Sequence, residues 1–259
     1  MKYIGGKHKI GKTIANILQL ICPIETKKTY LEPFCGSLGV FKLMTDYKKC
    51  YASDFHPDLI ALWKSIQNKT LKIPSRISKT KWLQLKNTKS PNAMKGLVGF
   101  GCSFGGVFFS GYSQEYAGSS GRNFYNETKR SIKKIEPIIQ KKNVKFYHKS
   151  YDKWNPKNML IYCDPPYKNK KGYKVHTKDE EFDHDKFWDT MRKWSKQNLV
   201  VISEETSPKD FKKIWSQKKH RTLNKQKNHK KECLFVHESL LSKIKKLMKE
   251  NKKKNKKKH

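Results

Sequence analysis

Short apolar runs alternate with longer amphipathic segments along most of the chain, and this alternation is typical of an α/β protein. The apolar runs predict a strand that begins at residue 29 and further strands at residues 50–54, 144–148, 159–164, 199–203 and 232–237. Helical spacing of apolar positions predicts helices at residues 12–21, 40–44, 58–67, 127–140, 185–194, 209–215 and 240–249. We therefore expect one sheet with helices packed on both faces.

The order of these segments divides the chain into an α/β domain and an insert. Residues 1–55 and 143–249 carry the strands, whereas residues 56–142 are mainly helical around a glycine- and aromatic-rich centre. Residues 250–259 are rich in lysine, a low-complexity composition that predicts a disordered tail.

The charge of the chain points to an acidic partner. A formal net charge of +36 over 259 residues favours binding to phosphate backbones, although most individual lysines belong to solvated faces. The six cysteines lack metal-ligand spacing, so we expect neither a structural metal site nor a disulfide framework. No run reaches membrane-spanning length and no secretion signal is visible, which predicts a soluble intracellular protein.

A tetrapeptide, Asp164-Pro165-Pro166-Tyr167, follows a short apolar run that predicts a buried strand. Such a strand would deliver Asp164 to the carboxyl edge of the sheet, where ligands of α/β proteins bind. The prolines remove two backbone donors, so carbonyl oxygens and one carboxylate remain as acceptors. These acceptors suit the exocyclic amine of a nucleobase, and the Tyr167 ring could stack on the base. A purely structural proline turn is the alternative.

A second motif comes early in the chain. Glu32, Pro33, Phe34 and Gly36 follow the first predicted strand, and a glycine there lets the backbone approach a ligand closely. Asp54 ends the next strand about twenty residues later, where a carboxylate commonly binds ribose hydroxyls. Together with Asp164, these residues predict a nucleoside-sized site at one sheet edge.

These motifs resemble those of the Dam-type DNA adenine-N6 methyltransferases, and the similarity extends from Tyr3 to about His237. It begins with Tyr3-Ile4-Gly5-Gly6-Lys7, which is similar to the aromatic-x-Gly-Gly-Lys motif of that family. The resemblance implies a Rossmann-like methyltransferase sheet, an insert that recognises DNA, and S-adenosylmethionine as the methyl donor. It also implies that the target adenine is flipped out of the duplex and methylated directly, with no metal ion and no covalent enzyme intermediate.

The family resemblance assigns roles residue by residue. The residues expected at the cofactor are Tyr3, Gly6, Lys7, Glu32, Phe34, Gly36, Asp54, Ser150, Tyr151 and Asp164. The residues expected to hold the target adenine and promote transfer are Asp164, Pro165, Pro166 and Tyr167.

The chain also departs from the family pattern. Leu38 replaces the second glycine of the cofactor loop, with Gly39 one step later, and His56 stands where an asparagine is common. Gly105 and Phe109 replace the asparagine and arginine that contact DNA in GATC-specific members. GATC specificity therefore does not transfer to this chain.

The insert should recognise DNA. Its glycine- and serine-rich loop and flank supply aromatic rings and hydrogen-bonding side chains, from which we expect Tyr112, Arg122, Asn123 and Arg130 to contact the duplex. Phe104, Phe108 and Phe109 are expected to pack a small core instead. Double-stranded DNA is the expected partner, a cognate restriction endonuclease is a candidate partner, and we expect a monomer.

Three other functions remain open from the sequence. Residues 6–13 fit a phosphate-loop pattern, which would make the chain an NTPase or nucleotide kinase, but only five residues precede Gly6 and that loop needs a strand before it. The methyl acceptor could instead be RNA or a protein glutamine. The chain could also be an inactive DNA-binding homologue, although Asp54 and Asp164 argue against this.

Overall fold

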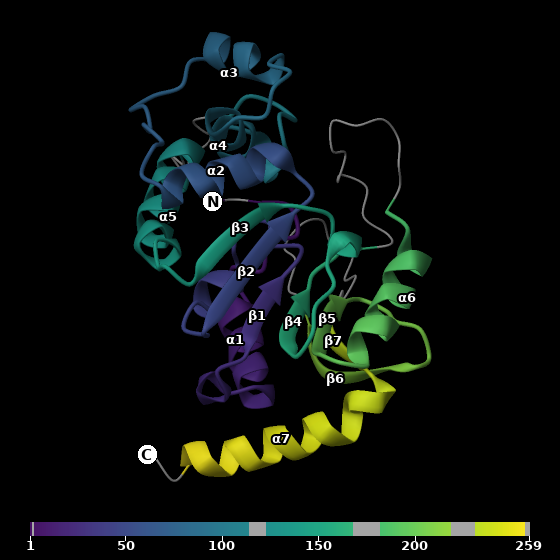
Figure 1. Cartoon of the computed structure of the whole chain (residues 1–259). Helices are drawn as coiled ribbons and strands as arrows, with labels where there is room; N and C mark the ends of the chain where they lie inside the picture. Colours follow the sequence, from purple (N-terminus) through teal and green to yellow (C-terminus); the bar gives the residue numbers. More distant parts are fainter. Residues whose placement is uncertain (2, 114–122, 168–181, 219–230, 257–259) are drawn as a thin grey trace.

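The computed structural model describes residues 1, 3–113, 123–167, 182–218 and 231–256 (Figure 1). Arg122, one of the predicted DNA contacts, lies outside the described residues, and so do the last residues of the lysine-rich tail.

The described strands form one mixed sheet. They are β1 (Thr29–Glu32), β2 (Lys49–Asp54), β3 (Val144–His148), β4 (Met159–Cys163), β5 (Leu199–Glu204), β6 (Phe211–Lys218) and β7 (Lys231–His237). Their order is β3-β2-β1-β4-β5-β7-β6. Strands β1 to β5 are parallel, and β7 is antiparallel to β5 and β6. This arrangement confirms the predicted α/β, Rossmann-like fold.

Helices flank the sheet on both faces and build the insert. The α-helices of the described residues are α1 (Gly11–Ile21), α2 (Pro57–Gln67), α3 (Lys79–Lys86), α4 (Ala93–Gly101), α5 (Phe124–Ile139), α6 (His184–Ser195) and α7 (Glu238–Lys256). Short 3-10 turns lie at η1 (Ile24–Thr26), η2 (Phe41–Leu43), η3 (Phe104–Gly106) and η4 (Tyr151–Lys153). The helix predicted at residues 40–44 is therefore only the single turn η2.

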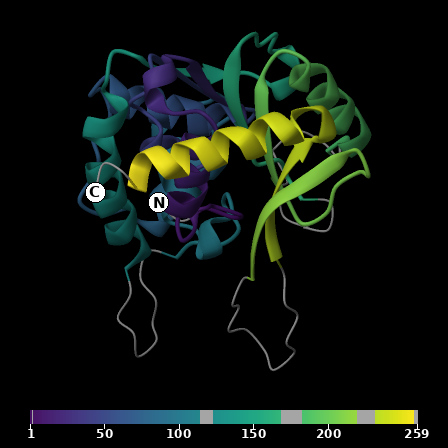
Figure 2. The ribbon, with the colours of Figure 1, turned by 90° about the horizontal axis from the view of Figure 1, so that it is seen from below.

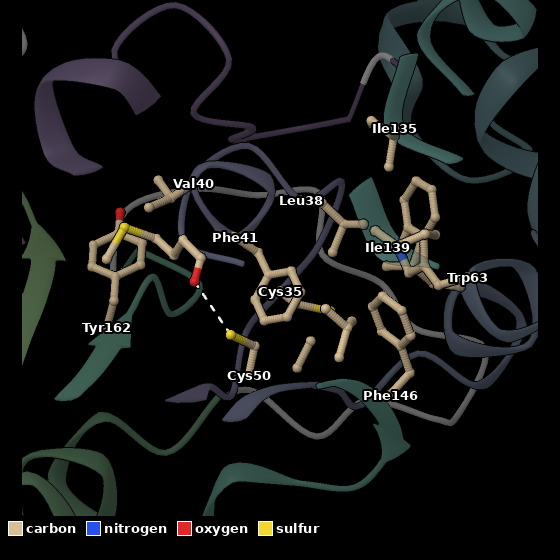
Figure 3. Packing of buried hydrophobic residues seen from close by; sticks show 14 of the residues in the cluster. Cys35, Leu38, Val40, Phe41, Cys50, Trp63, Ile135, Ile139, Phe146 and Tyr162 are labelled. Carbon is tan, nitrogen blue, oxygen red and sulfur yellow. Dashed lines mark hydrogen bonds between the residues drawn. The ribbon is translucent and has the colours of Figure 1, made fainter. Parts of the chain in front are cut away.

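Alternate residues of the central strands point to opposite faces of the sheet, and each face has its own core. Tyr30 and Tyr162 belong to the larger core, which includes residues of α1, α2 and α5. Figure 3 shows part of that core, in which Phe41 lies among side chains from strands and helices. Leu31 and Cys163 point to the smaller core, which α6 covers. Burial on both faces explains why these strands are continuously apolar.

Residues 209–215, which the sequence predicts to be a helix, instead lie largely in strand β6. This strand pairs with β7, and its register shifts between Lys213 and Trp215. A bulge of this kind places an extra residue in one strand and interrupts the two-residue alternation. The apolar residues Phe211, Ile214 and Trp215 consequently show a helical spacing although they lie in a strand.

The predicted disordered tail is also corrected in part, because α7 continues through Lys256. Asn251 is buried, and its side-chain amide donates a hydrogen bond of 2.9 Å to the Leu20 carbonyl at the end of α1. Lysine favours helix formation as well. Figure 2, which views the molecule from below, shows α7 crossing in front of the other elements.

The strand order reverses between β1 and β4, because the chain adds β2 and β3 on one side of β1 and places β4 on the other. Ligands of open α/β sheets bind at the carboxyl ends of strands beside such a reversal. In Figure 1 the arrowheads of β1 and β2 point toward α2, whereas α7 lies at the opposite end of the sheet. The carboxyl ends of β1 and β2 therefore lie on the side of α2, away from α7.

The interval 56–142 is continuous with the rest of the protein. Helix α2 contacts both α4 and β3, and buried residues of α2, α4 and α5 share one core with the sheet. A separate role for this interval in DNA recognition, and the division at residues 55/56 and 142/143, stay predictions.

Candidate active site

The reversal between β1 and β4 brings the two main sequence motifs to one edge. Strands β1 and β4 are parallel neighbours, with Thr29 opposite Met159 and Leu31 opposite Ile161. Glu32, the last residue of β1, and Asp164, which directly follows β4, therefore lie at neighbouring strand ends.

The N-terminal segment closes against this edge through Lys7. Its ammonium Nζ lies 2.5 Å from Asp164 Oδ1 and 3.3 Å from the Gly5 carbonyl oxygen. Lys7 is buried, which alone would lower the pKa of its ammonium, but the nearby carboxylates of Asp164 and Glu232 outweigh burial and raise that pKa. Lys7 therefore carries a positive charge beside the predicted catalytic carboxylate.

Glu232 on β7 is a site residue that the motifs did not identify. It is fully buried, its Oε1 accepts a hydrogen bond from the Tyr167 hydroxyl, and the same oxygen lies 3.6 Å from Lys7 Nζ. The available signal was a glutamate directly before the apolar segment 233–236. Sequence alone cannot show that this strand reaches Tyr167.

Tyr167 is enclosed by these charges. Its side chain is only 4% exposed, and Lys7 Nζ lies 4.8 Å from the centre of its ring. Burial raises the pKa of the Tyr167 hydroxyl well above its usual value, and the neighbouring carboxylates Asp164 and Glu232 act in the same direction. The hydroxyl is therefore a hydrogen-bond donor at neutral pH, and stacking of a base on the ring stays a prediction.

Glu32 lies beneath the same edge. Its buried carboxyl accepts a 2.7 Å hydrogen bond from the Tyr30 hydroxyl. Burial raises the pKa of Glu32 well above its ordinary value, and the Tyr30 hydrogen bond opposes that rise. Contact between Glu32 and a cofactor stays a prediction.

Asp54 fixes the glycine loop. Its Oδ2 accepts a 2.9 Å hydrogen bond from the Gly36 N–H, and its Oδ1 accepts one of 3.0 Å from the His56 N–H. Burial raises the pKa of Asp54, while these backbone donors lower it. Each carboxylate oxygen can accept a second hydrogen bond, so ribose binding is compatible with this role.

Gly36 is held where a side chain would not fit. Its φ is +45°, and a Cβ added there would lie 3.0 Å from a ring carbon of Tyr3. Gly6 packs on the same loop, because a Cβ there would lie 3.1 Å from Ser37 Oγ. Tyr3, Gly6 and Gly36 therefore meet as the resemblance implies, although contact with a cofactor stays a prediction.

The ring of Phe34 stacks on that of Tyr151, with ring centres 5.3 Å apart. Ser150 precedes Tyr151 and starts the turn η4. Phe55, which the motifs did not identify, follows Asp54 and is 53% exposed. The signal for it was an aromatic residue directly after a strand-ending acid. These rings line the same edge as Asp54.

Leu38, the departure in the loop, adopts the conformation that a glycine would favour. Its φ is +60° and its side chain is fully buried. Gly39 packs closely on the N-terminal segment, since a Cβ there would lie 3.0 Å from the Lys7 backbone nitrogen. The loop therefore keeps a left-handed residue despite the substitution.

The phosphate-loop alternative lacks its supporting elements. No strand precedes Gly6 among the described residues, and Lys12 is exposed on α1. A Cβ at Gly11 would lie 2.4 Å from the Gly39 carbonyl oxygen, so this glycine serves helix packing.

A comparison with protein families bears on the first part of the chain. Residues 3–91 match the D12 class of N6 adenine-specific DNA methyltransferases. The match contains the motifs from Tyr3 to Asp54 and ends before Asp164. It confirms the family resemblance over residues 3–91 and supports an adenine-specific DNA methyltransferase. A comparison with curated proteins finds no match.

The D12 match ends inside the interval 56–142. Of the three phenylalanines predicted to pack a small core in this interval, two do so. Phe109 is buried against Trp82, with ring centres 5.1 Å apart, and Phe108 packs on His56 at 4.3 Å. Phe104, predicted to pack with them, is 61% exposed. The turn η3 directs Phe104 away from the core, because Gly105 beside it has a φ of +68°.

The residues predicted to contact DNA have different surroundings. The Tyr112 hydroxyl donates to the Ile77 carbonyl at 2.7 Å, and the Asn123 side chain caps α5 by accepting from the Asn126 N–H at 2.8 Å. Both residues therefore stabilise the insert. Arg130 is exposed on α5 and is available to a phosphate.

No helix in the described part of the chain is long and apolar enough to cross a membrane.

Proposed function

We propose that the chain transfers the methyl group of S-adenosylmethionine to N6 of adenine in duplex DNA. The observation that carries this proposal is the position of Asp164. It directly follows β4, beside the loop with Gly36 that follows β1, at the point where the strand order reverses. The D12 match supports the same activity.

The residues at this edge fit a nucleoside-containing methyl donor. Asp54 can accept ribose hydroxyls, and the exposed Phe55 ring offers a stacking face. S-adenosylmethionine, when bound, supplies a methyl group that its sulfonium already activates. No residue of the chain then has to form a covalent bond to the methyl group.

The chain's own contribution is to position the amine. Asp164 and a carbonyl of Pro165 or Pro166 accept its hydrogen bonds, which localises the nitrogen lone pair and aligns it with the methyl carbon. With S-adenosylmethionine bound, the amine nitrogen would bond to the methyl carbon as the sulfur–methyl bond breaks, and Asp164 would receive the proton that the amine loses. The rate enhancement would come mainly from holding the amine close to the methyl carbon and from the hydrogen-bond acceptor directed at the amine.

The adenine must leave the duplex to reach Asp164, at a cost of about a few kcal/mol. Tyr167 is the predicted stacking partner, and its ring has to open from Lys7 to receive the base. Exposed groups of the insert, including Arg130 and Phe104, are candidates to hold the flanking DNA. One active site suffices for transfer to one flipped base, so a monomer would be competent.

Labelled S-adenosylmethionine tests the substrate class. The protein is incubated separately with unmethylated duplex DNA, with RNA and with protein, and transferred label is counted in each. We expect label in duplex DNA alone. Label only in RNA or protein would refute the proposed acceptor, and Asp164→Ala should abolish whatever transfer is found.

A further inference from the structure

The Lys7 ammonium binds Asp164 Oδ1, an oxygen of the carboxylate that the proposed reaction needs as an acceptor. Lys7 Nζ lies 2.5 Å from this oxygen, and both groups are largely withdrawn from water. A carboxylate paired this closely with an ammonium donates less electron density to a second partner. An incoming amine would therefore find Asp164 a weaker acceptor for as long as Lys7 stays in this position.

A second carboxylate lies beside the same ammonium. Glu232 Oε1 lies 3.6 Å from Lys7 Nζ and belongs to β7, a strand remote from Asp164 in sequence. A buried charge needs a counter-ion, because an unpaired one is strongly destabilising. Lysine has a flexible four-carbon stem, so a small rotation can carry Nζ from one carboxylate to the other.

Tyr167 joins these groups to the site of the base. Its hydroxyl donates to Glu232 Oε1, and its ring lies 4.8 Å from Lys7 Nζ. The tyrosine thus orients Glu232 and offers the ammonium a cation–π surface between the two carboxylates.

We propose that Glu232 is a positioning residue that receives the Lys7 ammonium when the target amine reaches Asp164. This inference rests on the proposed methyl transfer. Asp164 then regains its full acceptor strength, while Lys7 stays paired throughout. Glu232 acts through Lys7 and touches neither the base nor the methyl group.

Charge balance gives a specific test. Among the described residues, the Lys7 ammonium is shared between the carboxylates of Asp164 and Glu232. Glu232→Gln removes one of these two negative charges and leaves Lys7 beside Asp164. Lys7→Met in the same background restores one net negative charge on Asp164. The double variant should therefore be faster than Glu232→Gln.

The measurement is kcat and KM on duplex DNA for each variant. We expect Glu232→Gln to lower kcat by about ten- to a hundredfold, the range for losing a hydrogen bond to a charged group, with little change in KM for S-adenosylmethionine. Lys7→Met/Glu232→Gln should recover most of that loss. A double variant as slow as Glu232→Gln, or a Glu232→Gln enzyme with normal kcat, would overturn the inference.

Two further variants separate positioning from folding. Asp58→Asn breaks another buried pair, between Asp58 and Lys95 at 3.7 Å, and should lower the melting temperature without producing a kcat defect that Lys7→Met relieves. Tyr167→Phe keeps the ring, and combined with Glu232→Gln it should be no slower than Glu232→Gln alone. Additive losses in that double variant would count against the inference. A wild-type protein that transfers no methyl group to DNA would instead refute the proposed function.

Discussion

Asp164 concentrates the proposed chemistry in one side chain. It lies at the end of β4, its Oδ1 contacts Lys7, and the backbone after it lacks donors because prolines follow. The sequence predicted this acceptor from the tetrapeptide together with the Gly36 turn and Asp54. It could not predict the partner, since Lys7 and Asp164 are 157 positions apart in sequence.

The first prediction separates chemistry from binding. Asp164→Ala should abolish methyl transfer and leave DNA affinity nearly unchanged, because it removes an acceptor at the reacting nitrogen and no phosphate contact. Single-turnover transfer and equilibrium DNA binding are measured on the same preparation. Substantial turnover by this variant would show that another group orients the amine.

Leu38 supplies a prediction about backbone strain. Leu38→Ala should destabilise the protein by about 2–5 kcal/mol, as expected for a fully buried leucine. Leu38→Gly should be no less stable than Leu38→Ala, because a φ of +60° suits glycine and disfavours alanine.

Chemical denaturation of the two Leu38 variants gives the comparison. At ordinary strand or helix positions glycine is less stable than alanine by about 0.5–1 kcal/mol. Observing that usual order at position 38 would contradict the left-handed conformation of this residue.

Elements with a clear period were predictable, and the others were not. The strand at residues 144–148 has the predicted bounds, because apolar side chains there face a continuous core. Strand β6 was missed because its bulge breaks the alternation. Glu232 and Phe55 were missed as site residues for a related reason, since a one-dimensional pattern does not show which strand ends meet. Phe104 was misassigned because the direction of the turn η3 depends on Gly105.

The packing of α4 on α2 gives a prediction at the level of elements. A Cβ at Gly96 would lie 2.2 Å from the Asp58 carbonyl oxygen, so Gly96→Ala must push the two helices apart. We expect a loss of about 1–3 kcal/mol in unfolding free energy, as for other overpacked sites. DNA binding should weaken more than cofactor binding, because α4 leads directly into the turn that carries Phe104.

Gly111→Ala is the matched control, because a Cβ there meets nothing within 4 Å. Thermal unfolding of both variants, with binding of each ligand measured separately, makes the comparison. Equal stability of the two variants would show that α2 and α4 do not pack as closely as described.

The distribution of charge over the whole molecule separates two basic surfaces. Helix α7 carries exposed lysines, including Lys245 and Lys249, but it lies at the end of the sheet opposite the strand ends that hold Asp54 and Asp164 (Figure 1). A duplex is stiff over about 150 base pairs, so a short one bound at the active edge does not wrap around to α7. The insert, with Lys81 and Arg130 exposed, lies nearer that edge.

Salt dependence should distinguish these surfaces. On a short duplex, Lys81→Gln/Arg130→Gln should reduce the slope of log affinity against log salt by up to about 0.9 for each lost phosphate contact. Lys245→Gln/Lys249→Gln removes the same formal charge and should leave the slope unchanged. A larger effect from the α7 pair would place the duplex on the opposite end of the sheet.

The identity of the methylated base tests the central claim most directly. Unmethylated duplex DNA is incubated with the protein and labelled S-adenosylmethionine, digested to nucleosides and separated by chromatography. We expect all label to elute as N6-methyldeoxyadenosine with the wild-type protein and none to elute there with Asp164→Ala. Label in a methylated deoxycytidine, or unchanged N6-methyldeoxyadenosine from Asp164→Ala, would contradict the proposed transfer to adenine N6 by way of Asp164.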